Sequence, residues 1–227
     1  MPNNPKIHII DYGLGNLHSL GKAMNYLGVK TENISRPSDL GKTDGIIIPG
    51  VGAFGEGMTK LKERGFVEPL LEIASAGKPI LGICLGMQFF FSFSSEFGMH
   101  SGLNLIEGQV VSLSDSSKNT INNELKIPHI GWKPLLKRAN TIDWNNTILS
   151  EIKKDEEVYF VHSFMCVPDN EKYILAYAEY GNSRFAAVVK KGNIYGCQFH
   201  PEKSRETGIK ILREFVKIVI ANNKEVE

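Results

Sequence analysis

Three residues of this 227-residue chain have the types and settings needed for acyl-transfer chemistry: Cys84, His200 and Glu202. Cys84 stands at the centre of Gly82-Ile83-Cys84-Leu85-Gly86, between an apolar run typical of a buried strand and a segment predicted to be helical. A cysteine at such a turn, with glycine two residues before and after it, has the pattern of a nucleophile elbow, where larger flanking side chains would collide with neighbouring elements. A helix N-terminus there would stabilise a thiolate and point backbone N–H groups, first that of Leu85, at a developing oxyanion.

The triplet His200-Pro201-Glu202 follows the apolar run YGCQF and supplies a candidate base with its orienting group. Proline disfavours the helical region for the residue before it, and an extended backbone places residues i and i+2 on the same side. Glu202 can therefore bind one ring nitrogen of His200 and leave the other to take the thiol proton. Two alternatives are a surface ion pair that caps the last helix, and a zinc site that includes Cys84. The zinc site is disfavoured because these residues lack a usual ligand spacing.

A glycine-rich loop at Gly50, Val51 and Gly52 follows another apolar strand. With Gly55 it matches the GxGxxG fingerprint of dinucleotide-binding proteins. That fingerprint also needs an acidic residue at the end of a second strand, and the candidate, Glu72, falls in a segment predicted to be helical. We therefore expect the loop to lie beside the elbow and to offer a second N–H group to the oxyanion formed on Cys84.

The elements that must position these residues alternate between strand and helix in the first half of the chain. Strands are predicted at 6–10, 45–50 and 78–83, because these are short, uninterrupted apolar runs. Helices are predicted from an N-cap at Asn16 to a stop at Gly28, over 55–76 with a break near Gly65, and over LGMQFFFSF from Leu85, which is apolar nearly all round and so buried. This alternation is typical of a parallel sheet covered on both faces.

The second half is predicted to consist of mostly antiparallel strands and a closing helix. The strands are expected at 107–113, 125–130, 157–162, 172–180, 183–190 and 193–199. The polar stretch 112–124 is expected to be an exposed loop. The helix is expected over 203–221, with Ile209, Leu212, Val216 and Val219 on one face. Together the two halves predict an α/β fold in a single domain over residues 1–227, with a mostly parallel central sheet, helices on both faces and additional antiparallel strands.

Composition excludes several other classes of protein. The 26 basic and 25 acidic residues leave a formal charge of +1, which does not suit a protein that neutralises a nucleic-acid backbone. No segment has the apolar length of a membrane span, and the first residues do not have the pattern of a secretory signal. Cys166 and Cys197 are expected to be small buried hydrophobes, and the three cysteines form no disulfide framework, which indicates a reducing compartment such as the cytoplasm.

The combined motifs resemble those of the class I, triad-type glutamine amidotransferases, whose fold is flavodoxin-like. Within that family the resemblance is strongest to the glutaminase subunits of imidazole glycerol phosphate synthases of histidine biosynthesis. The matching stretches cover nearly the whole chain and follow the order of the family: IIDYGLGNLHSL, IIIPGVGAFGEGM, PILGICLGMQ, PHIGW, VYFVHS and GCQFHPEKS.

The resemblance implies that the Cys84 thiolate attacks the side-chain amide of L-glutamine, that His200 shuttles protons and that Glu202 orients His200. Gln88 and Glu96 would hold the substrate, and the backbone at His162 and Ser163 would close the site. Plainer roles for Gln88 and Glu96 are an ordinary helix residue and a residue that caps or solvates a loop. The resemblance implies no metal and no cofactor.

The resemblance also implies a partner, because free ammonia is largely protonated at neutral pH and must be passed on through a protected path. In the family this partner is a (β/α)₈-barrel cyclase, with which the glutaminase forms a heterodimer. Positions near that docking face correspond to Lys203, Tyr159 and Trp132. A solvated lysine and a core aromatic are the plainer roles for Lys203 and Tyr159.

Two departures from the family pattern concern the identity of the partner more than the chemistry. Lys133 stands where the family has asparagine after Gly-Trp, and Phe164-Met165 stands where it has two tyrosines. A related glutaminase group that supplies ammonia for the amino sugars of surface polysaccharides is therefore an alternative. A non-catalytic regulatory subunit with the same fold is an alternative of another class, although the intact Cys84, His200 and Glu202 argue against it.

Overall fold

The centre of the fold is a mixed sheet that takes strands from both halves of the chain. The computed structural model describes residues 5–114, 126–137 and 143–224. Within them the sheet has the order β2-β1-β3-β4-β14-β13-β12-β9, and its first five strands are parallel. The parallel strands are β1 (Ile7–Ile10), β2 (Thr31–Ile34), β3 (Gly45–Ile48), β4 (Ile80–Ile83) and β14 (Ile194–Cys197), and the antiparallel ones are β9 (Leu136–Lys137), β12 (Ile174–Tyr180) and β13 (Ser183–Lys191).

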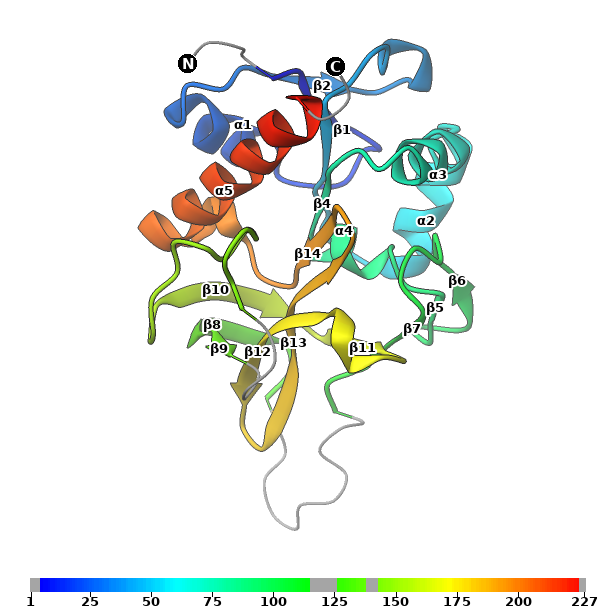
Figure 1. The fold of residues 1–227 in the computed structure, drawn as a ribbon. Coiled ribbons are helices and arrows are strands. Elements are labelled where there is room, and N and C mark those ends of the chain that lie inside the picture. Colours follow the sequence, from blue (N-terminus) through cyan, green and yellow to red (C-terminus); the bar gives the residue numbers. More distant parts are fainter. Residues whose placement is uncertain (1–4, 115–125, 138–142, 225–227) are drawn as a thin grey trace.

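Helices cover both faces of the parallel strands, as the sequence predicts. Figure 1 shows α1 and α5 on one side of β1, β4 and β14, and α2 and α3 on the other. The helices are α1 (Leu17–Tyr26), α2 (Phe54–Glu63), α3 (Val67–Ser75), α4 (Leu85–Gln88) and α5 (Arg205–Lys224).

Two hydrophobic clusters fill the space between the sheet and these helices. Successive side chains of a strand point to opposite faces, so each buried strand contributes to both clusters. Ile47 of β3 joins the cluster with α1 and α5, whereas its neighbours Ile46 and Ile48 join the cluster with α2 and α3. This two-sided burial is why the strands appear in the sequence as uninterrupted apolar runs.

Two smaller sheets accompany the main one. The first pairs β8 (His129–Pro134) with β10 (Glu157–His162), and the second has the order β11-β7-β5-β6. The strands of the second sheet are β5 (Phe93–Ser94), β6 (His100–Ser101), β7 (Gly108–Ser112) and β11 (Phe164–Pro168). Most of these pairs are antiparallel, as predicted, but β5 pairs with β7 in parallel.

Local signals in the sequence located several helix ends correctly. The Asn16 side chain accepts a hydrogen bond from the Ser19 N–H and so caps α1. The predicted break near Gly65 separates α2 from α3, and Gly65 has a φ of 72°, in the region that favours glycine. In α5, Leu212, Val216 and Val219 are buried on one face, with Ile209 packed beside them.

The prediction of a long helix from Leu85 is wrong, although the segment is buried as expected. The helix α4 ends at Gln88, and the following Phe89, Phe90 and Phe91 are fully buried in irregular structure. Their backbone carbonyls accept hydrogen bonds from the N–H groups of residues 103, 106 and 104, respectively. These hydrogen bonds to a distant segment replace those of a helix. Helical periodicity in the sequence does not reveal them.

Other predicted boundaries also differ from the structure. The strand expected at 125–130 is β8 and begins only at His129, because Pro128 has no N–H to donate to a strand ladder. Residue 125 and most of the predicted loop at 112–124 lie outside the described residues, while Ser112 still belongs to β7. The sequence did not reveal β2, which is half exposed, or β11.

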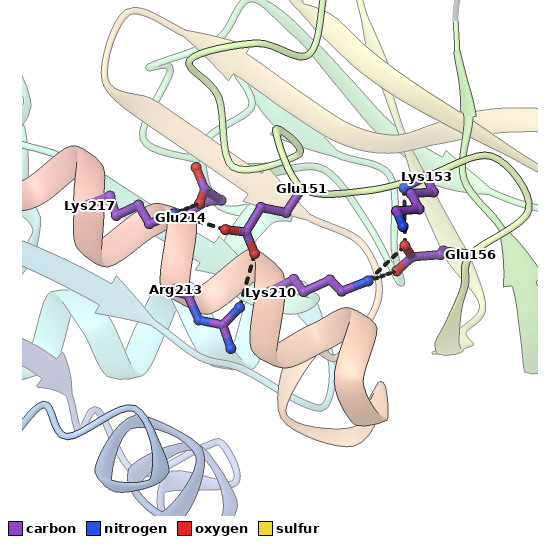
Figure 2. Close-up of polar contacts among 7 residues, drawn as sticks. All are labelled: Glu151, Lys153, Glu156, Lys210, Arg213, Glu214 and Lys217. Carbon is purple, nitrogen blue, oxygen red and sulfur yellow. Dashed lines mark hydrogen bonds and ion pairs between the residues drawn. The ribbon is translucent and has the colours of Figure 1, made fainter.

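A group of ion pairs attaches α5 to the segment that precedes β10 (Figure 2). Lys210 Nζ contacts the two carboxylate oxygens of Glu156 at 2.8 and 3.0 Å. Arg213 and Lys217 both bind Glu151, each at 2.9 Å. Because α5 starts at Arg205, three residues after Glu202, these ion pairs attach the helix that follows the His200–Glu202 triplet to the segment before β10.

We expect Lys210→Met to lower the free energy of unfolding by about 1 kcal/mol and Lys217→Met by only a few tenths. Lys210 and Glu156 are 22% and 18% exposed, whereas Lys217 is 56% exposed and therefore more screened by solvent. Urea unfolding at low salt and at about 1 M salt would measure both effects. A larger loss in Lys217→Met than in Lys210→Met would contradict this ranking.

Candidate active site

Cys84 occupies a strained elbow between β4 and α4. Its φ of 54° and ψ of −107° lie in a region that a non-glycine residue adopts only when its surroundings enforce it. The Cys84 N–H donates to the Cys197 carbonyl at 2.7 Å and fixes the elbow to β14. A Cβ on Gly86 would collide with the carbonyl of Ile48, and one on Gly82 with the backbone of Gly86, so the predicted need for glycine at both positions is confirmed.

His200 and Glu202 form a buried pair at the end of the neighbouring strand β14. The His200 Nδ1–H donates to Glu202 Oε1 at 2.8 Å, and the side chains are 2% and 3% exposed. The alternative of a surface ion pair is therefore wrong. Because Nδ1 carries this hydrogen bond, Nε2 is the nitrogen left to exchange a proton, and it is buried with no other hydrogen-bond partner among the described residues.

The electrostatics of His200 favour its protonated form. Burial alone would lower the pKa of His200, but the nearby negative charge of Cys84 and the hydrogen-bonded, negatively charged Glu202 outweigh burial and raise it to about 10. A thiolate on Cys84 and an imidazolium on His200 therefore stabilise each other. Since α4 has only four residues, we attribute less of this stabilisation to a helix dipole than the sequence suggested.

The position of His200 is fixed by hydrogen bonds to β10. The His200 N–H donates to the Tyr159 carbonyl at 3.0 Å, and the Tyr159 N–H donates to Ser204 Oγ at 2.9 Å. Ser204 Oγ in turn donates to the His200 carbonyl at 2.7 Å. These three hydrogen bonds tie the backbone of His200 to β10 and to Ser204, the residue before α5.

A cavity of 250 Å³ opens above Cys84. It would hold about eight waters at roughly 30 Å³ each, which suits a molecule of amino-acid size. The cavity collects most of the residues that the sequence and the resemblance single out, although Gly50, His200 and Glu202 are not among its lining residues. It is lined by Val51, Gly52, Cys84, Leu85, Gln88, Glu96, Pro128, Val161, His162, Ser163 and Phe164.

Glu96 and Gln88 supply polar groups on the cavity wall. Glu96 is 8% exposed, and its Oε2 accepts the N–H of Phe54 at 2.6 Å, so it caps α2 as well as lining the cavity. Gln88 is 5% exposed, and its Nε2 donates to the Phe164 carbonyl at 3.3 Å. Glu96 thus takes a capping role, one of the plainer roles that the sequence left open, while it also lines the cavity, and Gln88 is a buried residue of α4 with tertiary contacts.

The glycine loop lies against the elbow, as predicted. A Cβ on Gly50 would come within 2.8 Å of Leu85 Cβ and 3.1 Å of the Gly86 nitrogen. No acceptor for the N–H of Val51 or Gly52 is found within the part of the chain that the structure describes, and both residues line the cavity. The Leu85 N–H stands at the first position of α4, where helices provide no acceptor. Residues whose N–H groups have no acceptor within the described segments thus lie on both sides of Cys84.

The structure argues against a dinucleotide-binding site, because the candidate acidic residue is not placed to bind the ribose. Glu72 lies within α3 rather than at the end of a strand, as the sequence predicted.

Gln198 is a site residue that the sequence analysis missed. It is fully buried, its Nε2 lies 3.8 Å from Cys84 Sγ, and its Oε1 accepts from Gln88 Nε2 at 3.4 Å. Its place within the GCQFHPE motif, two residues before the candidate base, was the available signal.

A pair of neutral histidines, His129 and His162, braces the cavity wall, and the sequence analysis named the backbone of His162 but missed His129. The His162 Nδ1–H donates to the Phe164 carbonyl at 2.8 Å, so its Nε2 accepts from His129 Nδ1 at 3.1 Å. Burial lowers the pKa of His162 to about 3. Burial, helped by the charge of Lys133, lowers that of His129 to about 4. His129 Nε2 is left unprotonated and buried, with no hydrogen-bond donor to it among the described residues.

The residues assigned by resemblance to a docking face lie together beside His200. The rings of Trp132 and Tyr159 are 5.6 Å apart, and the Arg205 guanidinium lies 4.7 Å from the Trp132 ring. Tyr159 is half-buried rather than part of the core, and Lys203 is exposed.

The other two thiols, Cys166 and Cys197, provide no second nucleophile of this kind. Burial raises the pKa of Cys166 and Cys197 far above the usual thiol range, so both stay protonated. Among the described residues, no group of three His, Cys, Asp or Glu side chains could hold a metal ion. Within the same residues, no helix combines the length and apolarity needed to cross a membrane.

The chain belongs to the class I glutamine amidotransferase family, whose model matches residues 8–219. The subunit HisH 1 of imidazole glycerol phosphate synthase from Legionella pneumophila (strain Paris) is 46% identical over 213 residues, which cover 93% of this chain and 99% of that protein. The corresponding HisH subunit of Geobacter metallireducens is 41% identical over 209 residues, covering 92% and 96% of the two chains.

Solved structures agree on the fold. PurLQS from Thermotoga maritima matches with a TM-score of 0.72 at 19% identity, covering 95% of this chain and 99% of that one. A glutamine amidotransferase from the same organism matches with a TM-score of 0.59 at 16% identity, covering 99% and 87%. The predicted α/β fold, with its central sheet between helices, is thereby confirmed.

The buried histidine pair predicts a loss of stability in mild acid. Groups whose folded pKa is depressed stabilise the fold fully above their unfolded pKa of about 6.5 and lose that contribution as pH falls toward the folded value. We expect the free energy of unfolding to fall between pH 6.5 and about 4, by up to ~1.4 kcal/mol per pH unit for each titrating histidine. Urea unfolding at stepped pH would measure this slope.

His129→Phe serves as the control, because it keeps a ring between Phe160 and Tyr180 and removes one titrating group. We expect a shallower slope in this variant over the same pH range. An unchanged slope would show that the histidine pair does not cause the acid sensitivity.

Proposed function

We propose that this chain hydrolyses L-glutamine to glutamate and ammonia through a thioester on Cys84, and passes the ammonia to a cyclase subunit that makes imidazole glycerol phosphate and aminoimidazole carboxamide ribonucleotide in histidine biosynthesis. One observation carries the chemistry. A strained cysteine lies under a cavity of amino-acid size, with a buried imidazole–carboxylate pair behind it. The HisH names of relatives at 46% and 41% identity support the pathway.

In the proposed reaction the Cys84 thiolate attacks the carbonyl carbon of the glutamine side chain. The resulting oxyanion receives hydrogen bonds from the N–H of Leu85 and from an N–H of the loop at 50–52. As the C–N bond breaks, the His200 imidazolium gives its Nε2 proton to the leaving nitrogen, and ammonia departs. Water, deprotonated by His200, then attacks the thioester carbonyl and releases glutamate and the thiolate. Glu202 stabilises the imidazolium and holds its orientation during both thioester formation and thioester hydrolysis.

Substrate recognition is proposed to depend on the polar groups of the cavity wall. Glu96 offers a carboxylate to the α-ammonium of glutamine, and its bond to the Phe54 N–H holds that carboxylate in place. The Gln88 amide donates to protein acceptors through Nε2, which leaves its carbonyl oxygen for the substrate. The backbone at His162 and Ser163 closes the other side of the cavity. A site with such buried polar groups discriminates against analogues that leave them unpaired.

The proposed partner is a (β/α)₈-barrel cyclase that forms a heterodimer with this chain. It would dock on the face made by Trp132, Tyr159, Lys203 and Arg205, where half-buried aromatic and exposed cationic side chains lie together. Aromatic and arginine side chains are enriched at the energetic centres of interfaces. This face lies directly beside His200, so a partner bound there would adjoin the point at which ammonia is formed.

We further propose that residues 1–227 form one glutaminase domain, because strands from both halves join the same sheet. The cytoplasm is the proposed compartment. All three cysteines are free and buried, which suits a reducing environment.

The reaction is tested by measuring glutamate release from glutamine, with and without a histidine-pathway cyclase and its nucleotide ligand. We expect the cyclase to raise the rate by orders of magnitude. Cys84→Ala should abolish release, and Glu202→Gln should lower kcat by about 100-fold or more, because the imidazole loses its tautomer and charge partner. Cys197→Ala is the matched control and should keep its activity. Wild-type rates in Cys84→Ala would exclude the mechanism and favour a non-catalytic subunit.

The docking face is tested separately by titrating the cyclase against Lys203→Ala and Trp132→Ala variants. We expect each variant to weaken the apparent affinity by at least about tenfold, equivalent to ~1.4 kcal/mol. Lys42→Ala, an exposed residue just before the amino end of β3 and so at the sheet edge away from His200, should bind normally. Glutamine hydrolysis without any cyclase binding would preserve the chemistry and point to another ammonia acceptor, with amino-sugar synthesis the next to test.

A further inference from the structure

Tyr12 carries a buried hydroxyl that the resting structure does not use. The side chain is fully buried, and its ring packs edge-on against Phe89, with centroids 5.6 Å apart. The hydroxyl oxygen has no hydrogen-bond partner among the described residues. An unsatisfied buried polar group costs about 1–3 kcal/mol, and phenylalanine would fill the same space without this cost. The stability of the fold therefore gives no reason for a hydroxyl here.

The hydroxyl lies directly against the glycine loop. A Cβ built on Gly50 would collide with the Tyr12 oxygen, and it would also come within 2.8 Å of Leu85 Cβ. Burial and the negative charge of Cys84 both raise the pKa of Tyr12 far above its usual value. Tyr12 thus remains a neutral O–H donor at every working pH, within reach of the charge on Cys84.

Peptide geometry explains what such a donor could do. The bond between Gly50 and Val51 is trans, so the Val51 N–H and the Gly50 carbonyl point in opposite directions. If the Val51 N–H turns into the cavity toward an oxyanion, the Gly50 carbonyl must turn away from the cavity, into the protein. A buried carbonyl without a donor is costly. Among the described residues, Tyr12 supplies an unpaired donor beside Gly50.

We propose that Tyr12 is a positioning residue of the glycine loop, whose hydroxyl donates to the Gly50 carbonyl when the Val51 N–H faces the oxyanion. This inference rests on the proposed glutaminase function. The hydrogen bond forms only in the catalytic arrangement of the loop, so it stabilises the transition state more than the resting enzyme or the bound substrate. An interaction of this kind acts on kcat and leaves KM nearly unchanged.

The test is Tyr12→Phe in the full chain, assayed for glutamate release with the cyclase and its nucleotide ligand present. We expect kcat to fall about tenfold, as for the loss of one hydrogen bond made in the transition state, and KM to stay within about twofold. The thermal midpoint of the isolated chain should be equal to or above that of the wild type, because the variant removes an unsatisfied hydroxyl. A purely structural role would instead lower the midpoint.

Tyr195→Phe is the matched control, since Tyr195 is also buried but lies near the start of β14, away from the site. We expect it to keep the wild-type kcat. An unchanged kcat in Tyr12→Phe, an equal loss in Tyr195→Phe, or a loss accompanied by a lower thermal midpoint would overturn the inference alone. A wild-type chain that releases no glutamate would overturn the proposed function and this inference with it.

Discussion

The parallel pairing of β4 with β14 is the constraint on which the whole site depends. Cys84 and His200 are far apart in the sequence, yet Cys84 directly follows β4 and His200 comes three residues after the end of the neighbouring β14. The hydrogen bond from the Cys84 N–H to the Cys197 carbonyl continues that pairing into the elbow. Because the carboxyl ends of parallel strands meet at one edge of the sheet, the nucleophile and its base meet without a dedicated loop to hold them. Glycines at 82 and 86 then let strand and helix approach closely enough for the turn to form.

Much of this arrangement is predictable because it is local. The apolar runs of β1, β3 and β4, the Asn16 cap and the Gly82-to-Gly86 pattern all encode their structure within a few residues. The triplet at 200–202 is local as well, since the proline itself sets the backbone that lets Glu202 reach His200. From these local features the central part of the fold and the candidate triad could be predicted.

What the sequence could not predict depends on contacts between distant segments. The backbone carbonyls of Phe89 to Phe91 bind residues 103–106, so a stretch with helical composition leaves the helix after one turn. Gln198 and His129 are polar residues inside apolar runs, and only the packed structure shows that one reaches the sulfur and the other braces His162. The cavity likewise combines short pieces from both halves of the chain, whose approach no periodicity encodes.

The direction of α5 has a practical consequence. The helix starts at Arg205, next to the site, and ends at Lys224, and twenty residues at about 1.5 Å each span roughly 30 Å. Near its far end, Val219 packs against Gly45 at the start of β3, the edge of the sheet opposite Cys84. A fluorophore or surface tether attached at Lys224 would therefore sit on the side remote from the cavity. Such a label offers a way to follow partner docking in real time without covering the mouth of the site.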